Sequence, residues 1–309
     1  MTVSKVTDAL LNRRVIRQTK PPKASAGRRA GLLSLNSDFF TIVLDLTEKN
    51  FVFTVINAKQ EAINTSVFSY NDNFLFRENL QRFLKDSAEY LEHSLPKTLC
   101  MGIGVAVPGC YLPEADRIDS DLLPEFGSLS VLEMTRTAFE DLPIQIDTAT
   151  NAAALSNAAC AGLKTDEMAL YCYIGEQVIR AALLRGDHIM SGAHRSAAQL
   201  AKIQLTQGVT LQNSITSRTT KKETASLLAH AFCNTILLLD PVAILLECQN
   251  KETTGVLSDA VHEALIDEFK FDPNKLPPIL SANAAVPHAH RGLSLSIRQV
   301  WLTRLVMEE

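Results

Sequence analysis

The chain has 309 residues, of which 46% are hydrophobic and 21% are charged, and its formal net charge is −4 at pH 7. These values are typical of a soluble globular protein with enough material for two lobes. No apolar run reaches the ~20 residues of a membrane span, and the polar, basic N-terminus has no signal-peptide core. We therefore expect a cytoplasmic protein without membrane contact.

The six cysteines lie far apart, mostly inside apolar segments, and no two form a C-x-x-C pair. This pattern predicts small buried hydrophobic residues in a reducing compartment. They are Cys100, Cys110, Cys160, Cys172, Cys233 and Cys248.

Positive charge is concentrated at the N-terminus. Residues 1–30 contain eight lysines and arginines against Asp8 alone, a net charge of about +7 that leaves about −11 for the rest of the chain. A basic arm on an acidic body predicts contact with phosphate groups. The alternative is a solvated, disordered tail.

The order of elements within this arm is informative. Residues 2–11 (TVSKVTDALL) predict an amphipathic helix with Val3, Val6 and Leu10 on one face. Two strand candidates follow, RRVIRQT and RRAGLLSLN, joined by the basic loop KPPKASAG. Helix, strand, basic loop and strand is the order of a recognition helix followed by a wing.

The arm resembles the winged helix-turn-helix of regulators in the ROK family (repressor, open reading frame, kinase), in which a TVSxVTxxLLxxxxI helix reads the major groove and a G-R-R stretch ends the wing. No two helices precede it here, so we expect a partial, truncated or vestigial module. The resemblance implies base contacts from Thr2, Ser4, Lys5 and Thr7. It implies phosphate or minor-groove contacts from Arg13, Arg14, Arg17, Lys20, Lys23, Arg28 and Arg29.

The body begins with alternating apolar residues typical of a hairpin, Phe40 to Leu44 and Phe51 to Val55, followed by a third strand over 63–68. A helix over 75–95 and the buried strand TLCMGIGVAVPG come next. Three strands, a helix and a strand resemble the start of the ROK sugar kinases. The resemblance implies an α/β, two-lobed actin-like ATPase or sugar kinase (ribonuclease H-like) fold, with domains at 1–35, 36–147 and 148–309.

The stretch LPIQIDTATNAAALSNAACAG, residues 142–162, predicts a strand that hands directly to an alanine-rich helix over 151–161, capped by Thr148 or Thr150. The N–H groups that open such a helix can hold anions or sugar hydroxyls. ROK kinases have E-N-D-A-N-A-A-A-L here, and its aspartate is the base that deprotonates the sugar. This chain has Ala149 at that position, and alanine cannot accept a proton. A register slip of two residues would bring Asp147 into use, but the N-A-A-A-L match argues against it.

Other kinase motifs are altered as well. The phosphate hairpin D-x-G-x-T reads DLTEK, residues 45–49, and keeps Asp45 but no glycine. The family's A-G-E-L-G-H motif has Gln199 for its glutamate and Lys202 for its histidine, and its C-x-C-G-x-x-G-C zinc module is absent. DPVAILLECQ, residues 240–249, has Glu247 and Cys248 in place of glycines that approach adenine. Helices over 225–239, 256–269 and 293–307 and a strand over 278–280 complete the predicted fold.

By the same resemblance, the candidate sugar or effector contacts are Gly109, Asp121, Thr148, Asn151 and Gln199. The favoured hypothesis is a ROK-type transcriptional regulator that binds an operator and dimerises, as a homodimer or dimer of dimers, through a catalytically inactive body without cofactor or metal. One alternative is a sugar kinase that phosphorylates a hexose or amino sugar with ATP. The other is a pseudokinase that acts through protein contacts and binds no DNA.

Overall fold

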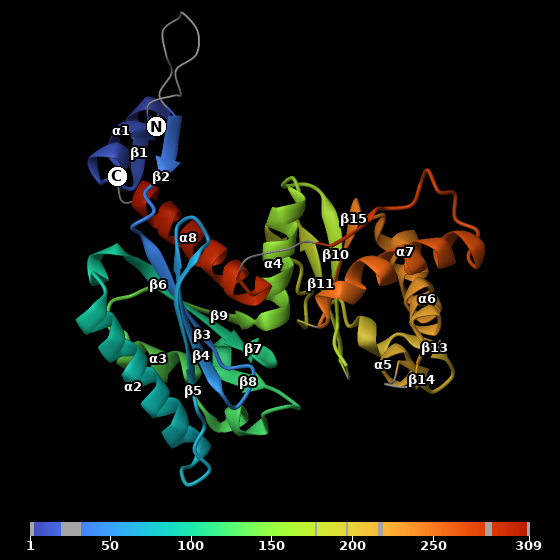
Figure 1. Cartoon of the computed structure of the whole chain (residues 1–309), viewed down its shortest axis with the longest axis horizontal. Helices are drawn as coiled ribbons and strands as arrows, with labels where there is room; N and C mark the ends of the chain where they lie inside the picture. Colours follow the sequence, from blue (N-terminus) through green and yellow to red (C-terminus); the bar gives the residue numbers. More distant parts are fainter. Residues whose placement is uncertain are drawn as a thin grey trace, which may run out of the picture. The chain divides into compact units, whose positions relative to one another are not determined.

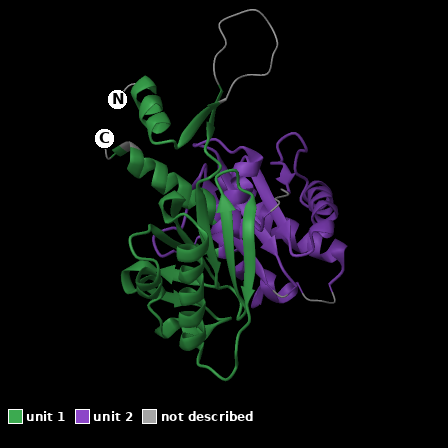
Figure 2. Cartoon of the chain, turned by 60° about the vertical axis from the view of Figure 1, so that its left-hand side comes forward, with its two compact units in different colours: residues 1–148, 293–309 green, residues 149–292 purple. Residues whose placement is uncertain are grey.

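The computed structural model describes residues 3–19, 32–176, 178–195, 197–215, 219–281 and 286–307. The chain forms two compact units, unit 1 with residues 1–148 and 293–309 and unit 2 with residues 149–292 (Figure 2). The division after Thr148 lies one residue beyond the lobe boundary that the sequence predicts. It differs from the predicted domains in two ways, because the last 17 residues return to unit 1 and the N-terminal arm also belongs to that unit.

Unit 1 is built on a five-stranded sheet in the order β5-β4-β3-β6-β9 (Figure 1). β3, β4 and β5 form an antiparallel meander, whereas β6 and β9 run parallel to β3. The predicted hairpin, third strand and buried strand are therefore confirmed. The strands are β3 (Phe40–Asp45), β4 (Phe51–Asn57), β5 (Ala62–Phe68), β6 (Cys100–Val107) and β9 (Ile144–Thr148).

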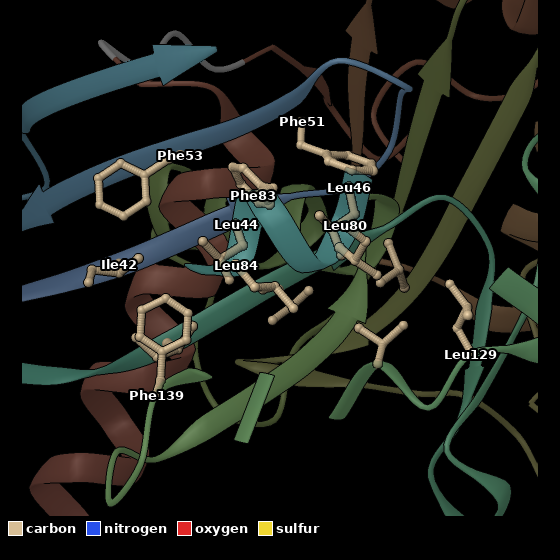
Figure 3. Close-up of a cluster of buried hydrophobic side chains, with 14 of the residues drawn as sticks. Ile42, Leu44, Leu46, Phe51, Phe53, Leu80, Phe83, Leu84, Leu129 and Phe139 are labelled. Atoms are coloured by element: carbon tan, nitrogen blue, oxygen red, sulfur yellow. The ribbon is translucent and has the colours of Figure 1, made fainter. Parts of the chain in front are cut away.

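One face of this sheet is covered by α2 (Phe76–Ser94), with α3 (Val131–Ala138) beside it. Leu80, Phe83 and Leu84 of α2 pack against the alternate side chains of β3 and β4, such as Leu44 and Phe51 (Figure 3). Because successive side chains of a strand point to opposite faces, the alternating apolar residues that predicted these strands lie on the face that packs in this core. Two short strands, β7 (Cys110–Leu112) and β8 (Arg117–Asp119), form a hairpin after β6.

The opposite face of the sheet carries the C-terminal helix α8 (His288–Met307). Gly102 and Gly104 of β6 allow this close approach, since a Cβ on Gly104 would lie 2.9 Å from the Cβ of Leu293. The helix begins five residues before the predicted residue 293. Its first residues lie in unit 2 and the remainder in unit 1.

The described residues of the N-terminal arm form regular secondary structure. The arm consists of α1 (Val3–Asn12), β1 (Ile16–Thr19) and β2 (Leu32–Leu35), so the predicted helix and two strands are present, and the two strands pair antiparallel. We call these elements the N-terminal module. Leu10, Ile16 and Leu35 pack in one cluster with Leu302 and Leu305 near the end of α8, beside which the module lies in Figures 1 and 2.

Unit 2 has its own five-stranded sheet, in the order β12-β11-β10-β15-β16. The two long helices α6 and α7 pack on each other and form a core with the sheet, while the alanine-rich α4 packs on β10 and β11. The main elements are α4 (Ala149–Ala161), β10 (Met168–Ile174), β11 (Ile179–Arg185), β12 (His188–Ile189), α6 (Lys221–Leu239), β15 (Ala243–Cys248), α7 (Lys251–Asp267) and β16 (Ile279–Leu280). Shorter elements lie between β12 and α6: β13 (Gln204–Thr206), β14 (Val209–Thr210) and α5 (Leu211–Ser214).

Three helices of unit 2 start earlier than the apolar periodicity predicts, and polar residues cap two of them, α6 and α7. α6 begins at Lys221, where the hydroxyl of Thr220 accepts from the Glu223 N–H and the Glu223 carboxylate accepts from the Thr220 N–H. The hydroxyl of Thr220 also donates to Glu223 and lowers the pKa of that carboxyl. α7 begins at Lys251, after Asn250, whose side chain accepts from the Glu252 N–H. α4 begins at Ala149, so of the two predicted caps Thr148 occupies the position directly before the helix, whereas Thr150 lies inside the first turn and is not the cap.

The cysteines are free, and Cys100, Cys172 and Cys248 are buried as predicted, but Cys160 is exposed. Burial raises the pKa of the Cys100 thiol to about 12 and that of Cys172 further. Because the thiolate is the reactive form, we expect a thiol reagent to label Cys160 rapidly and the buried pair only on unfolding. Mass spectrometry of the native protein after brief labelling tests this. Preferential labelling of Cys172 would contradict the described packing.

No helix among the described residues has the length and apolar character needed to cross a membrane.

Candidate functional site

The parallel strands of unit 1 end in a row of polar residues. Asp45, the last residue of β3, lies opposite Ala106 of β6, and Ala106 lies opposite Asp147 of β9. Residues directly opposite one another share a face of the sheet, so both carboxylates lie on one face at its carboxyl edge, ~10 Å apart across the intervening strand. Ligands of α/β proteins bind outside this edge.

Asp45 is held by its own turn. Its Oδ1 accepts from the backbone N–H of Thr47 at 2.9 Å and from the Thr47 hydroxyl. Thr47, which stands where the resemblance implies a phosphate-loop glycine, therefore donates two hydrogen bonds to Asp45, the aspartate that the loop retains. Residues 40–51, which form β3 and its turn, contain no glycine, so the close backbone approach that glycines allow in a phosphate loop is missing here.

At the end of β9 the chain passes directly into α4. Asp147 Oδ1 accepts from the Thr148 N–H at 2.7 Å, and Ala149 is the first residue of the helix. Asn151 follows in the first turn and is half-buried. The helix N-terminus predicted from the sequence is thus present, and the first helical residue, Ala149, to which the resemblance assigns the position of the kinase base, carries only a methyl group.

Gly109 and Asp121 flank the β7–β8 hairpin. A Cβ on Gly109 would lie 2.0 Å from the carbonyl oxygen of Asp119, so the hairpin can close only over a glycine. β7 lies beside β9, and Val107 pairs with Thr148, which brings Gly109, Asp121 and Thr148 to the same end of the sheet in unit 1. Asp121 is exposed.

Gln199 is a residue of unit 2 and is exposed, immediately before a short 3-10 helix, Leu200–Lys202. Its side chain does not cap that helix. Asn151 belongs to unit 2 as well. Of the five candidate effector residues, Gly109, Asp121 and Thr148 thus belong to unit 1, and Asn151 and Gln199 belong to unit 2.

A polar network in unit 2 was not predicted from the sequence. The Glu247 carboxylate on β15 accepts from the Tyr171 hydroxyl at 2.8 Å and from Asn157 Nδ2 of α4 at 3.0 Å. Burial, and then the negative charge of Glu247, raise the pKa of Tyr171 well above its usual value. Glu247 therefore connects β15 with β10 and α4. The only sign of this network in the sequence is Glu247, a charged residue where the resemblance implies a glycine.

The exposed face of α1 presents Ser4, Lys5 and Asp8. Thr7 is half-buried, and its hydroxyl donates to the carbonyl of Val3 at 2.9 Å, one turn earlier in the same helix. Of the predicted base-contacting residues within the described range, Ser4 and Lys5 are thus openly presented. The carboxylate of Asp8, one turn along, reduces the positive charge of this face.

Arginines of the N-terminal module also make contacts within unit 1. Arg13 Nη1 donates to the Leu305 carbonyl of α8 at 3.1 Å, and Arg17 forms an ion pair with Asp38. Arg14 is exposed, with its backbone in the left-handed region at φ +56° where α1 ends, and its carbonyl accepts from Asn36 at 3.1 Å. Arg14 therefore presents its charge to solvent, whereas Arg13 and Arg17 connect the module to the body. The remaining predicted DNA contacts, Thr2, Lys20, Lys23, Arg28 and Arg29, lie outside the described residues.

Comparison with known proteins identifies the architecture. No protein-family model and no curated protein sequence matches the chain. A solved ROK family transcriptional regulator, a homologue of the E. coli MLC protein, superposes with a TM-score of 0.75 and 15% identity, covering 99% of this chain and 91% of that chain. The chain has the fold of ROK family proteins.

Solved ROK proteins of other kinds share this fold. A ROK family protein from Streptococcus pneumoniae, in complex with sucrose, superposes with a TM-score of 0.68 and 17% identity over 85% of this chain and 99% of that chain. The ROK hexokinase from Thermus thermophilus has a TM-score of 0.67 and 16% identity, with the same two coverages. The predicted α/β, actin-like sugar kinase fold is confirmed. Since both a regulator and kinases have it, the fold alone does not distinguish these two activities.

Proposed function

We propose that the chain is a ROK-type transcriptional regulator. Its N-terminal module binds DNA, and its sugar-kinase-like body senses a small polar effector without catalysis. A ligand that binds one lobe arrangement better than another shifts the balance between the two, and in a dimer this changes the spacing of the two recognition helices.

The observation that carries this proposal is the extent of the regulator match. Coverage of 99% leaves only about three residues of this chain unmatched, so the alignment includes nearly all of the N-terminal module. The hexokinase and the sucrose complex cover 85%, which leaves about 46 residues, more than the whole module. The regulator therefore matches a larger part of this chain than the hexokinase and the sucrose complex do, and this difference supports the proposal.

The site geometry supports an inactive body. Ala149 cannot take a proton from a sugar hydroxyl, and Asp45 is satisfied by Thr47. Glu247 places a carboxylate where the resemblance requires a glycine for adenine, and it is bonded to Tyr171 and Asn157. The effector contacts in this proposal are Gly109, Asp121, Thr148, Asn151 and Gln199, which offer hydroxyl, amide and carboxylate groups to a polyol.

The test is DNA binding measured by fluorescence anisotropy, first with a random-sequence duplex pool and then with the sequence selected from it. We expect a selected site to bind at least ~10³-fold more tightly than the pool, with affinity that falls as salt rises. Arg14→Gln should lower the slope of log affinity against log salt by about 1, since Arg14 is exposed and one predicted phosphate contact is lost. The matched control is Lys85→Gln on α2, whose side chain is 75% exposed, and it should leave the slope unchanged.

Absence of any selected sequence, or equal effects of the two substitutions, would reject DNA recognition by the module and favour the pseudokinase that acts through protein contacts. The kinase alternative is favoured by the number of sugar kinases that share the fold. It requires magnesium-dependent ATP consumption in the presence of hexoses or amino sugars, and we expect none.

A further inference from the structure

The edge strand β5 of unit 1 has an open side. Among the described strands it pairs only with β4, so the backbone groups on its other side have no strand partner. Its seven residues, AINTSVF, contain no charged residue and no proline. Soluble proteins usually protect such an edge with lysines, prolines or bulges. Here a bulge near Ala62 is the only such feature, and the pairing with β4 is regular from Asn64 to Phe68.

Large apolar side chains on β5 are exposed. Val67 is 62% and Ile63 is 54% exposed, and Thr65 between them is exposed as well. They lie on the sheet face opposite Phe68, because neighbouring residues of a strand alternate between faces. Phe68 packs on the core beneath α2, and its ring centroid is 6.3 Å from that of Phe51. An uncharged edge with exposed β-branched side chains is suited to pairing with another strand.

We propose that β5 pairs antiparallel with β5 of a second copy of this chain, with the two-fold axis at Ser66. This arrangement joins two five-stranded sheets into one continuous ten-stranded sheet. The proposal is independent of DNA binding, since it uses only the sheet of unit 1.

The strand is complementary to itself. Pairing about Ser66 places Val67 of each copy opposite Thr65 of the other, which forms two β-branched cross-strand pairs on the exposed face. Beyond the strand, Glu61 falls opposite Asn71, and Gln60 falls opposite Asp72, so no like charges meet. In this pair the open side of each β5 is covered by the other β5, so the assembly closes at two copies rather than growing into a fibre.

The first test is the oligomeric state in solution by sedimentation velocity. We expect the protein to sediment as a dimer and Val67→Lys to shift it to the monomer, because the lysines of the two copies would be diagonal neighbours on the same face of the joined sheet, close to the axis. Val256→Lys is the matched control, since Val256 is 55% exposed on α7 in unit 2, and it should remain dimeric. Far-UV circular dichroism verifies that both variants fold. A monomeric wild-type protein, or a dimer unaffected by Val67→Lys, would overturn the proposal.

The second test fixes the register. Residues opposite one another on antiparallel strands have Cβ atoms ~5 Å apart, within reach of the ~4 Å needed for a disulfide. Ser66→Cys should therefore form an intermolecular disulfide under mild oxidation, which non-reducing electrophoresis detects. Ser69→Cys, just beyond the strand and also exposed, would place its two thiols about six residues or ~20 Å apart and should not. Equal crosslinking of the two variants, or none at Ser66, would reject this register.

Discussion

Gly292→Ala is expected to lower the free energy of unfolding by about 3 kcal/mol or more, although alanine is the better helix former. Gly292 lies in α8, and a Cβ there would be 1.6 Å from the carbonyl oxygen of Ala152 in α4. No rotamer change relieves this contact, because the positions of the added Cβ and of the Ala152 carbonyl oxygen are both fixed by helix backbone. The two helices would have to separate, and the buried contact between Ser156 and His288, whose Oγ and Nδ1 are 2.8 Å apart, would be disturbed with them.

Gly255→Ala is the matched control, since Gly255 also lies in a helix of unit 2, α7. No atom lies within 4 Å of its added Cβ, so this substitution should raise stability by about 0.5–1 kcal/mol. Urea unfolding followed by circular dichroism measures both. Effects of the same sign in the two variants would mean that the close approach of α8 and α4 does not exist in solution.

Much of the fold could be predicted from the sequence because its strands and helices have regular apolar periods. The hairpin from Phe40 to Val55 alternates cleanly, and each inward residue is buried. The start of α8 was missed because its first turn reads HAHRG, which has no apolar period. His288 and His290 are nevertheless only 4% exposed, so polar residues form the buried side of this turn.

The candidate site was less predictable because its contacts join distant parts of the chain. The Ala149 substitution and the helix N-terminus could be located from local sequence. The bonds of Glu247 to Tyr171 and Asn157 span 76 and 90 residues, and that of Arg13 to Leu305 spans 292. Such pairs follow from the tertiary fold, which no local pattern encodes. Arg13 and Arg17 were accordingly predicted only as DNA contacts, whereas both also bind the body of unit 1.

Phe39→Ala is expected to loosen the N-terminal module and to lower the free energy of unfolding by about 3–5 kcal/mol. Phe39 is 7% exposed, and its ring centroid lies 4.8 Å from that of Trp301 on α8. The same cluster includes Val15 and Leu10 from the module, so removal of the ring opens a cavity beneath it. Trp301 is the single tryptophan of the chain, and its emission should shift to longer wavelength as water enters the cluster.

The matched control is Phe74→Ala. Phe74 is 40% exposed, with the Arg82 guanidinium 4.5 Å from its ring centroid, and its loss should cost no more than about 1 kcal/mol and leave Trp301 emission unchanged. If the module binds DNA as proposed, Phe39→Ala should also weaken DNA binding under conditions in which the variant stays folded, because α1 is then no longer held against α8. Unchanged emission in Phe39→Ala would show that this cluster does not anchor the module. A shifted emission with unchanged DNA affinity would instead show that recognition does not depend on the anchored position of α1.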